Sequence, residues 1–244
     1  TFSVTKIFAD GNDEAEITVS IDCNTGLILD QDKLLSNGES VEFVVTSFTP
    51  GAMSCTITED GQAGYDGEYN NISLGEINDE SCVYETIAGT AAFSCEITNT
   101  ASPVDIVINK EWVIEGSLSA SGIDQGFGLD LYCESAGMTG PGAHNDGGNS
   151  WHGYDNGEGD ETFIWQIVPL FPSSSCYVEE YSLDSYVEVD NPCGNLVASV
   201  GNGVECTITN TVFFEGIPTL SQYGMAILAL LMLGVGFVSF RRFS

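Results

Sequence analysis

Three polar residue types recur at matched places in the two halves of the chain, and together they could form a covalent crosslink. Lysine, glutamate and asparagine occur first as Lys6, Glu59 and Asn99, and again as Lys110, Glu180 and Asn210. Each lies two residues from apolar residues at alternating positions. Because alternate side chains of a β-strand share one face, we expect all six side chains to point into a core.

Burial would change the reactivity of these groups. It disfavours charge, so it lowers the pKa of a lysine and raises that of a glutamate. A neutral lysine amine is a nucleophile, and a protonated carboxyl group can polarise an amide carbonyl. Attack of each lysine on its asparagine, with loss of ammonia, would leave an isopeptide bond between the first and last strands. The alternative is a buried Lys–Glu ion pair to which the asparagine is hydrogen-bonded.

The cysteines indicate that the scaffold is a tandem duplication. Cys82 and Cys95 align with Cys193 and Cys206 at a separation of 111 residues, while Cys55 aligns with Cys176 across a longer separation that implies an insertion. We therefore divide the chain into three parts: repeat 1 (1–101), repeat 2 (102–213) and a C-terminal segment (214–244).

The sequence pattern of both repeats predicts an all-β structure. Alternating apolar and polar residues rich in Val, Ile, Thr and Phe predict strands, separated by clusters of Gly, Asn, Asp and Ser. The expected strands of repeat 1 are 17–23, 41–48, 53–59 and 93–100, and those of repeat 2 include 127–133 and 163–170. Short strands at this spacing favour one Ig-like β-sandwich per repeat. The Gly, Asn and Asp-rich insertion 137–161 has no period, and we expect a surface loop there.

Eight cysteines without any CxxC pair favour disulfides formed in an oxidising compartment rather than zinc sites. Four cysteines per repeat allow three pairings. Cys82 and Cys95 bracket a segment short enough for a hairpin, and Cys23 and Cys55 end facing core strands, so these two pairs are favoured in repeat 1. By position, the pairs in repeat 2 are Cys133 with Cys176 and Cys193 with Cys206.

The charge and the motif content exclude several functions. Thirty-six acidic residues against five basic ones give a net charge of −31, which repels nucleic acid. The chain has no GxSxG, no HExxH and no glycine-rich phosphate loop, and its only two histidines lie in the insertion. We therefore expect no enzyme activity and no cofactor.

The acidic insertion is the one place where a ligand is considered. Its oxygen groups, Asp146, Asp155, Glu158 and Asp160, could hold Ca²⁺, although the EF-hand order is missing; zinc ranks below calcium. Trp151, His152 and Tyr154 could serve an adhesin that binds a glycan or another surface protein. A spacer role is the simpler alternative.

The C-terminal segment predicts a membrane anchor. Residues 223–240 carry no charge over 18 residues, about 27 Å of helix, enough to cross a bilayer core. Arg241 and Arg242 follow, so the C-terminus is expected to be cytoplasmic and the repeats outside the cytosol. A buried soluble helix is the alternative. The start at Thr1, without an initiator Met, indicates a processed or truncated end.

The polar residues resemble the pattern of a known family. A lysine on the first strand, then TITEDGQAGY (56–65) with Glu59 six residues before Tyr65, then EITNT with Asn99, is similar to the CnaB/SpaA-type prealbumin-like domains of bacterial surface proteins. Repeat 2 keeps Glu180 and Tyr186 at the same spacing. The resemblance covers nearly all of 1–213 and implies autocatalytic isopeptide bonds within both Lys, Glu and Asn sets. The disulfides depart from the family pattern.

The tail resembles a second family, the IPTL-CTERM sorting signals of Gram-negative bacteria. The matching features are an IPTL motif, an aromatic-Gly pair, one membrane helix and a basic end, carried by Ile217, Pro218, Thr219, Leu220, Tyr223, Gly224, Arg241 and Arg242. The family usually has tryptophan where this chain has Tyr223. The resemblance implies processing by an exosortase-type membrane enzyme. A plain anchor is the alternative, and a GPI signal fits less well because such tails seldom end in Arg-Arg.

These features predict a non-enzymatic stalk or matrix protein at the bacterial cell envelope. It would consist of two tandem β-sandwiches, stabilised by disulfides and intramolecular isopeptide bonds, followed by one C-terminal transmembrane helix. Its expected partners are the membrane, the processing enzyme and other surface proteins or glycans. An adhesin module and an extracellular filament subunit are the alternative functions.

Overall fold

The computed structural model describes residues 1–89, 91–115, 126–181, 183 and 187–213. Every regular element in these ranges is a β-strand, which confirms the all-β prediction for this part of the chain. None of the described segments forms a helix of the length and apolarity needed to cross a membrane. The expected transmembrane helix 223–240 lies outside the described residues.

Repeat 1 contains eleven strands in two main sheets. One sheet has the order β5-β1-β11-β8-β9 and the other the order β10-β7-β2-β4, while β3 and β6 pair separately. The strands are β1 (Phe2–Phe8), β2 (Glu16–Cys23), β3 (Leu27–Ile28), β4 (Asp32–Ser36), β5 (Ser40–Phe43), β6 (Val45–Thr46), β7 (Met53–Glu59), β8 (Tyr65–Asn71), β9 (Glu76–Asn78), β10 (Cys82–Ile87) and β11 (Phe93–Ala101).

Repeat 2 contains ten strands in two five-stranded sheets. Their orders are β14-β17-β12-β21-β19 and β15-β16-β13-β18-β20. The strands are β12 (Val104–Glu115), β13 (Gly126–Glu134), β14 (Gly137–Thr139), β15 (His144–Gly147), β16 (Ser150–Glu158), β17 (Glu161–Val168), β18 (Ser174–Tyr181), β19 (Val187–Asp190), β20 (Leu196–Ala198) and β21 (Val204–Phe213).

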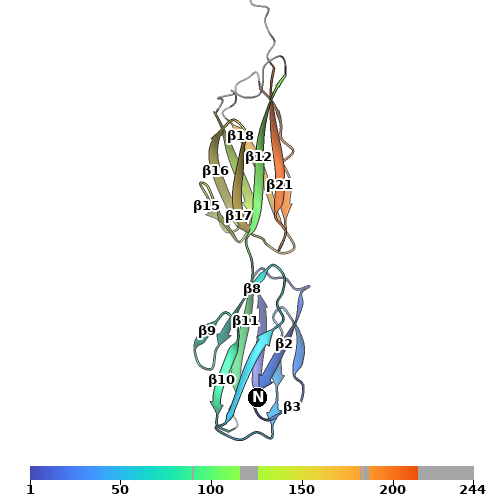
Figure 1. The fold of residues 1–244 in the computed structure, drawn as a ribbon, viewed down its shortest axis with the longest axis vertical. Coiled ribbons are helices and arrows are strands. Elements are labelled where there is room, and N and C mark those ends of the chain that lie inside the picture. The colour runs from blue at the N-terminus through green and yellow to red at the C-terminus, as the bar shows by residue number, and fades with distance from the viewer. Residues whose placement is uncertain (90, 116–125, 182, 184–186, 214–244) are drawn as a thin grey trace, which may run out of the picture.

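In both repeats the first and last strands are parallel neighbours. β1 pairs with β11 from Phe2 opposite Phe93 to Phe8 opposite Asn99, and β12 pairs with β21 in the same way. Figure 1 shows β12 and β21 side by side. Because the two strands run in the same direction, the chain enters each repeat at one end of the sheet and leaves it at the other.

Each repeat has its own hydrophobic core, to which both of its main sheets contribute. In repeat 1, Val4 and Ile97 of the β1–β11 pair meet Ile21 and Ile57 of the facing sheet, and all four are fully buried. In repeat 2 the core includes Ile108, Leu131, Trp165 and Ile208. The alternation in the sequence therefore identifies the core face of the long strands, as period-2 burial requires.

The prediction that residues 137–161 form a surface loop is wrong. This stretch forms β14, β15, β16 and the first residue of β17, and β16 pairs with β13 from Gly126 opposite Glu158 to Glu134 opposite Ser150. Gly, Asn and Asp have low strand propensity, which is why the sequence favours a loop. The backbone ladder with β13 and the packing of the facing sheet override that local preference.

The glycines of β16 have a packing role. A Cβ at Gly153 would lie 2.5 Å from Nε1 of Trp165, and one at Gly157 would lie 2.6 Å from Cζ of Phe163. Aromatic rings from β17 thus occupy the space that side chains of β16 would otherwise fill. These glycines mark the close approach of a neighbouring element rather than a turn.

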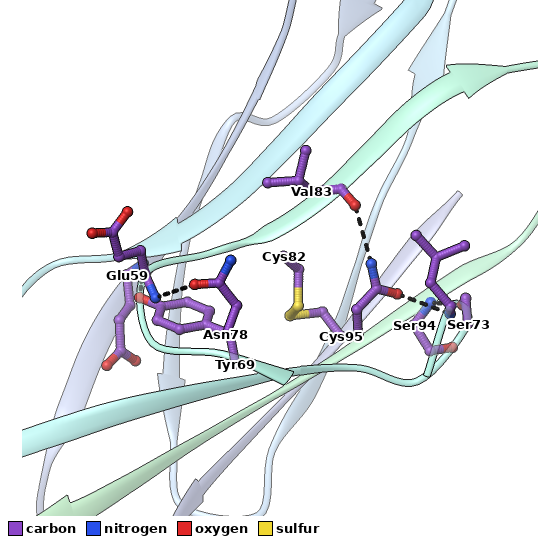
Figure 2. The surroundings of a disulfide bond; sticks show 11 residues. Glu59, Tyr69, Ser73, Asn78, Cys82, Val83, Ser94 and Cys95 are labelled. Atoms are coloured by element: carbon purple, nitrogen blue, oxygen red, sulfur yellow. Dashed lines mark hydrogen bonds between the residues drawn. A yellow bond between two sulfur atoms is a disulfide. The ribbon is translucent and has the colours of Figure 1, made fainter. Parts of the chain in front are cut away.

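Four disulfides join the cysteine pairs that the sequence favours: Cys23–Cys55, Cys82–Cys95, Cys133–Cys176 and Cys193–Cys206. The hairpin expected between Cys82 and Cys95 does not form. Cys82 lies on β10 and Cys95 on β11, which belong to different sheets, so this bridge crosses the core (Figure 2). Cys23 lies directly opposite Cys55 on the adjacent strands of one sheet. Repeat 1 thus has one bridge within a sheet and one between its sheets.

Candidate functional site

The lysine, glutamate and asparagine of repeat 1 meet inside its core. Lys6 on β1 is fully buried, Asn99 on β11 is 1 % exposed, and the Nζ of Lys6 lies 2.8 Å from Oε2 of Glu59 at the end of β7. Asn99 pairs with Phe8, two residues beyond Lys6, so the lysine and asparagine side chains share the inner face of neighbouring strands. The Oδ1 atom of Asn99 is buried without a hydrogen-bond partner.

Repeat 2 assembles the same three residue types from the equivalent strands. Lys110 on β12 lies opposite Ile208, and Asn210 lies opposite Trp112, which reproduces the two-residue offset. Oε1 of Glu180 accepts a 2.8 Å hydrogen bond from Nδ2 of Asn210 and lies 3.4 Å from the Nζ of Lys110. One carboxylate oxygen therefore contacts both the amine and the amide.

Burial shifts the pKa of both lysines and of Glu180 in the direction that favours the neutral form. Burial lowers the pKa of Lys6, although Glu59 partly offsets the effect. Burial also lowers the pKa of Lys110, to about 8, against the opposing charge of Glu180 and a smaller effect of Asp160. Burial raises the pKa of Glu180, with Lys110 and Asn210 acting in the opposite direction. Lys110 is therefore closer to a neutral amine at physiological pH than an exposed lysine would be.

Aromatic rings surround both amines. The Nζ of Lys6 lies 4.8 Å from the ring centroid of Phe8, and the Nζ of Lys110 lies 5.0 Å from Trp112 and 5.6 Å from Phe127. These rings keep water from the amines and stabilise whatever cationic fraction remains. The sequence indicates Phe8 and Trp112 by their strand parity, whereas Phe127 reaches Lys110 only through the packing of the two sheets.

Gly67 is a residue of the repeat 1 site that the sequence analysis did not identify. It lies opposite Asn99 on β8, and a Cβ there would stand 3.0 Å from Oε1 of Glu59 and 3.2 Å from Oδ1 of Asn99. A glycine therefore leaves the space that the carboxylate and the amide occupy. No local pattern distinguishes it from a turn glycine, because the constraint comes from residues distant in sequence.

The tyrosine that follows Glu59 belongs to a different network. The hydroxyl of Tyr65 donates to Oδ2 of Asp10 at 2.7 Å and accepts from Nδ2 of Asn12 at 2.9 Å. Burial, with help from Asp10, raises its pKa to about 12, so Tyr65 stays protonated. Its counterpart, Tyr186, lies outside the described residues.

The oxygen groups considered for calcium do not gather in one place. Asp160 accepts a 2.7 Å hydrogen bond from the backbone N–H of Trp112. Within the described ranges, one group of three or more possible metal ligands forms, and of the four carboxylates it contains only Asp146, joined by His144 and His152. The sequence analysis placed both histidines in the insertion and ranked zinc below calcium, but it did not expect His144 to lie opposite His152, because the insertion was treated as a loop.

The aromatic residues considered for ligand binding separate onto two faces of β16. Trp151 is half-buried against the core of repeat 2, whereas Tyr154 is exposed and His152 stacks on Tyr132 with ring centroids 4.5 Å apart. His152 and Tyr154 therefore share the outer face of the strand, opposite to Trp151.

Comparison with solved structures gives distant matches. The chain is similar to the major pilin T3.2 of Streptococcus pyogenes, at 12 % identity and a TM-score of 0.35, covering 86 % of this chain and 97 % of that one. A second major pilin from Streptococcus pyogenes matches at 14 % identity and a TM-score of 0.30, with 87 % and 98 % covered. The TIE protein of Bacillus anthracis matches at 11 % identity and a TM-score of 0.41, covering 87 % of this chain but 33 % of its own length.

Sequence comparison is informative at the C-terminus. Among curated proteins, none matches the chain. A family model, the IPTL-CTERM motif, matches residues 216–242. The eight tail residues that the sequence analysis identifies, from Ile217 to Arg242, fall inside this match, and all lie outside the described residues. The chain therefore ends in an IPTL-CTERM motif.

Proposed function

We propose that this chain is a structural protein of the bacterial cell surface, in which two covalently closed, prealbumin-like domains act in series as a stalk. The observation that carries the proposal is the buried Lys, Glu and Asn set that recurs across the parallel first and last strands of both repeats. A chain under tension needs its terminal strands held together, and this is where the reactive groups lie.

The crosslinking reaction follows from the arrangement of the groups. The neutral Nζ of Lys110 attacks the side-chain carbonyl carbon of Asn210, an N–C bond forms, and the amide nitrogen leaves as ammonia after taking up a proton. Once the side-chain amide of Asn210 rotates so that its oxygen faces the carboxyl group, protonated Glu180 donates a hydrogen bond to that oxygen. Glu180 also relays the proton from the amine to the leaving group. Lys6, Glu59 and Asn99 would react in the same way.

Two features support the reaction over a permanent ion pair. First, burial lowers the pKa of both lysines, which raises the fraction of nucleophilic amine. Second, the Oδ1 atoms of Asn99 and Asn210 are both buried without hydrogen-bond partners. An orphaned buried acceptor costs about 1 to 3 kcal/mol, and in the proposed reaction this oxygen gains a partner, because it accepts the hydrogen bond from the protonated glutamate.

The C-terminal segment would hold the stalk at the envelope. The IPTL-CTERM motif at 216–242 supports recognition by an exosortase-type enzyme and a membrane helix at 223–240, with the two repeats on the extracytoplasmic side. Four disulfides are consistent with an oxidising compartment. Further partners would be other surface proteins.

The test is the intact mass of the full chain after complete reduction. We expect wild type to be lighter than its sequence mass by two molecules of ammonia. Lys6→Met and Lys110→Met should each restore one, and the double variant both. Methionine keeps most of the aliphatic volume, and near-UV circular dichroism checks folding. Glu59→Gln and Glu180→Gln retain the lysines and should also block their own repeat. A wild-type mass equal to the sequence mass would overturn the crosslinks.

A binding module is the second candidate function, and one observation favours it. The outer face of β13, β16 and β18 carries stacked rings, with Tyr132 lying 4.5 Å from His152 and 4.8 Å from Tyr177 between centroids. Such a platform suits the apolar face of a sugar ring. Retention of the chain on a glycan array, lost in Tyr132→Ala and Tyr177→Ala, would support an adhesin. Polymerisation of the purified chain would instead favour a filament subunit.

A further inference from the structure

Two histidines and an aspartate converge on the hairpin that the sequence analysis took for a loop. β15 is the edge strand of its sheet and pairs with β16, with His144 directly opposite His152. Asp146 lies two residues along β15, where the register of the hairpin shifts. One ligand atom from each of His144, Asp146 and His152 lies within 4.8 Å of the other two.

The hydrogen bonding of His144 leaves its second ring nitrogen free. Its Nδ1 lies 2.9 Å from the backbone carbonyl oxygen of Gly142, which can only accept, so Nδ1 carries the proton and donates. In the neutral ring, Nε2 then presents a lone pair, and that atom lies 3.3 Å from Oδ1 of Asp146. Two acceptors facing each other at this distance repel unless a cation lies between them.

His152, on the neighbouring strand, also lies against a carboxylate, but this one, Asp130, is outside the group of three possible ligands. Its Nε2 atom is buried without a hydrogen-bond partner, and it lies 3.4 Å from Oδ1 of Asp130 on β13. The ring is held in place by stacking on Tyr132, with 7° between the two planes. A carboxylate placed against a metal-binding imidazole is the usual way in which proteins orient that ring.

We propose that His144, Asp146 and His152 bind a divalent transition-metal ion of the zinc type, with Asp130 orienting His152. Two imidazoles and one carboxylate form the three-ligand set to which zinc adds water as the fourth ligand. Calcium and magnesium prefer oxygen ligands and would gain little from the imidazoles. The strongly negative chain concentrates cations near this face.

The bound ion would close the edge of the sheet. The ion would connect β15 to β16, and the contact of His152 with Asp130 would connect both to β13. The exposed β15–β16 hairpin would thus be fixed to the rest of its sheet. His144 and the neighbouring Tyr154 are exposed, so water or a ligand atom from another molecule would be able to reach the ion as its fourth ligand. This inference does not depend on the isopeptide bonds, because the two sites share no residue.

The alternative is that protonation neutralises these contacts, with each imidazolium paired to its aspartate. Zinc binding separates the two cases. We would strip the full chain with a chelator, dialyse it against micromolar Zn²⁺ in the presence of millimolar Ca²⁺ to occupy ordinary surface carboxylates, and measure zinc per chain by elemental analysis. Competition with a chromophoric zinc chelator would give the affinity.

We expect one zinc ion per chain and a rise in the melting temperature of repeat 2 on binding. His144→Ala and His152→Ala should each abolish the stoichiometric binding, and Asp130→Asn should weaken it about 10- to 100-fold, the usual effect of removing a carboxylate that orients a metal-binding imidazole. Glu158→Gln is the matched control, since it removes one carboxylate from the same strand and should change nothing. No stoichiometric binding by wild type, or equal binding by the double histidine variant, would overturn the site.

Discussion

At the scale of single residues, the position of each lysine decides what it can do. Lys33 lies 2.6 Å from Asp30 at the surface, and an exposed pair of this kind contributes little to stability. Lys6 and Lys110 make their ion pairs inside the cores, where removing an ammonium from water costs several kcal/mol. Two of the three lysines among the described residues are therefore held where the amine is driven toward its neutral, nucleophilic form.

The lowered pKa of Lys110 predicts how the stability of repeat 2 depends on pH in a variant that cannot form the crosslink. In Asn210→Ala the amine remains free. Its folded pKa of about 8 lies below the ordinary value of 10.5, so between these pH values the unfolded state binds more protons and stability rises with pH. We expect the free energy of unfolding of repeat 2 to increase by roughly 1 kcal/mol from pH 7 to pH 9.

The control for that measurement is Lys110→Met combined with Asn210→Ala, which lacks the amine and should lose the rise. The raised pKa of Glu180 acts with the opposite sign, since a folded state that favours the protonated carboxyl loses stability as pH rises through that pKa. The difference between the two variants, followed by denaturant unfolding, isolates the lysine. Parallel pH profiles would contradict a lowered pKa for Lys110.

At the scale of elements, β16 shows how tertiary contact can make a strand from a polar, glycine-rich sequence. Its inward positions include Gly153, Asp155 and Gly157, opposite Leu131, Leu129 and Phe127 of β13. The apolar side chains in this part of the core come from β13 and from the aromatic residues of β17, not from β16. The pairing with β13 supplies the backbone hydrogen bonds.

Gly157→Ala tests that account. The added methyl would lie 2.6 Å from Cζ of Phe163 and 2.7 Å from Cζ of Phe127, so both rings must move. We expect repeat 2 to lose about 1 to 3 kcal/mol of stability, the usual cost of overpacking a core. Gly126→Ala is the matched control on the partner strand, because its nearest non-neighbour atom is 3.9 Å away. Equal denaturation midpoints for the two variants would show that ring packing does not set the choice of glycine.

At the scale of the whole molecule, the parallel terminal strands define the route of tension through the chain. A pull on the two ends of a repeat loads β1 against β11, or β12 against β21, along their length. With the proposed bonds in place, force would pass from Lys6 to Asn99 and from Lys110 to Asn210. All eight cysteines lie between these crosslink positions in sequence, so the disulfides would carry no load.

Single-molecule force spectroscopy on the full chain, held by its two ends, tests this route. We expect the repeats of wild type to show no unfolding extension, with or without reducing agent. Lys6→Met combined with Lys110→Met should show two unfolding events, which lengthen on reduction because the disulfides no longer shorten the released chain. Unfolding events in wild type that lengthen on reduction would mean that the terminal strands are not joined.

Features that depend on strand parity and residue spacing can be predicted from the sequence alone. Alternation every two residues places Lys6, Glu59 and Asn99 on an inward face regardless of how the sheets pack, because the side-chain period of a strand is fixed. The repeat of the cysteines likewise favours the four pairs that the structure forms. These conclusions require only local geometry and comparison of the two halves.

Which distant segments meet is visible only in the folded chain. The tertiary structure turned residues 137–161 into strands, carried the Cys82–Cys95 bridge across the core, and placed Gly67 against Asn99. It also brought His144 opposite His152 across a hairpin whose sequence has no apolar alternation. The physical reason is that a polar, glycine-rich segment has little conformational preference of its own, so its structure is set by the backbone partners and aromatic rings that the rest of the fold presents to it.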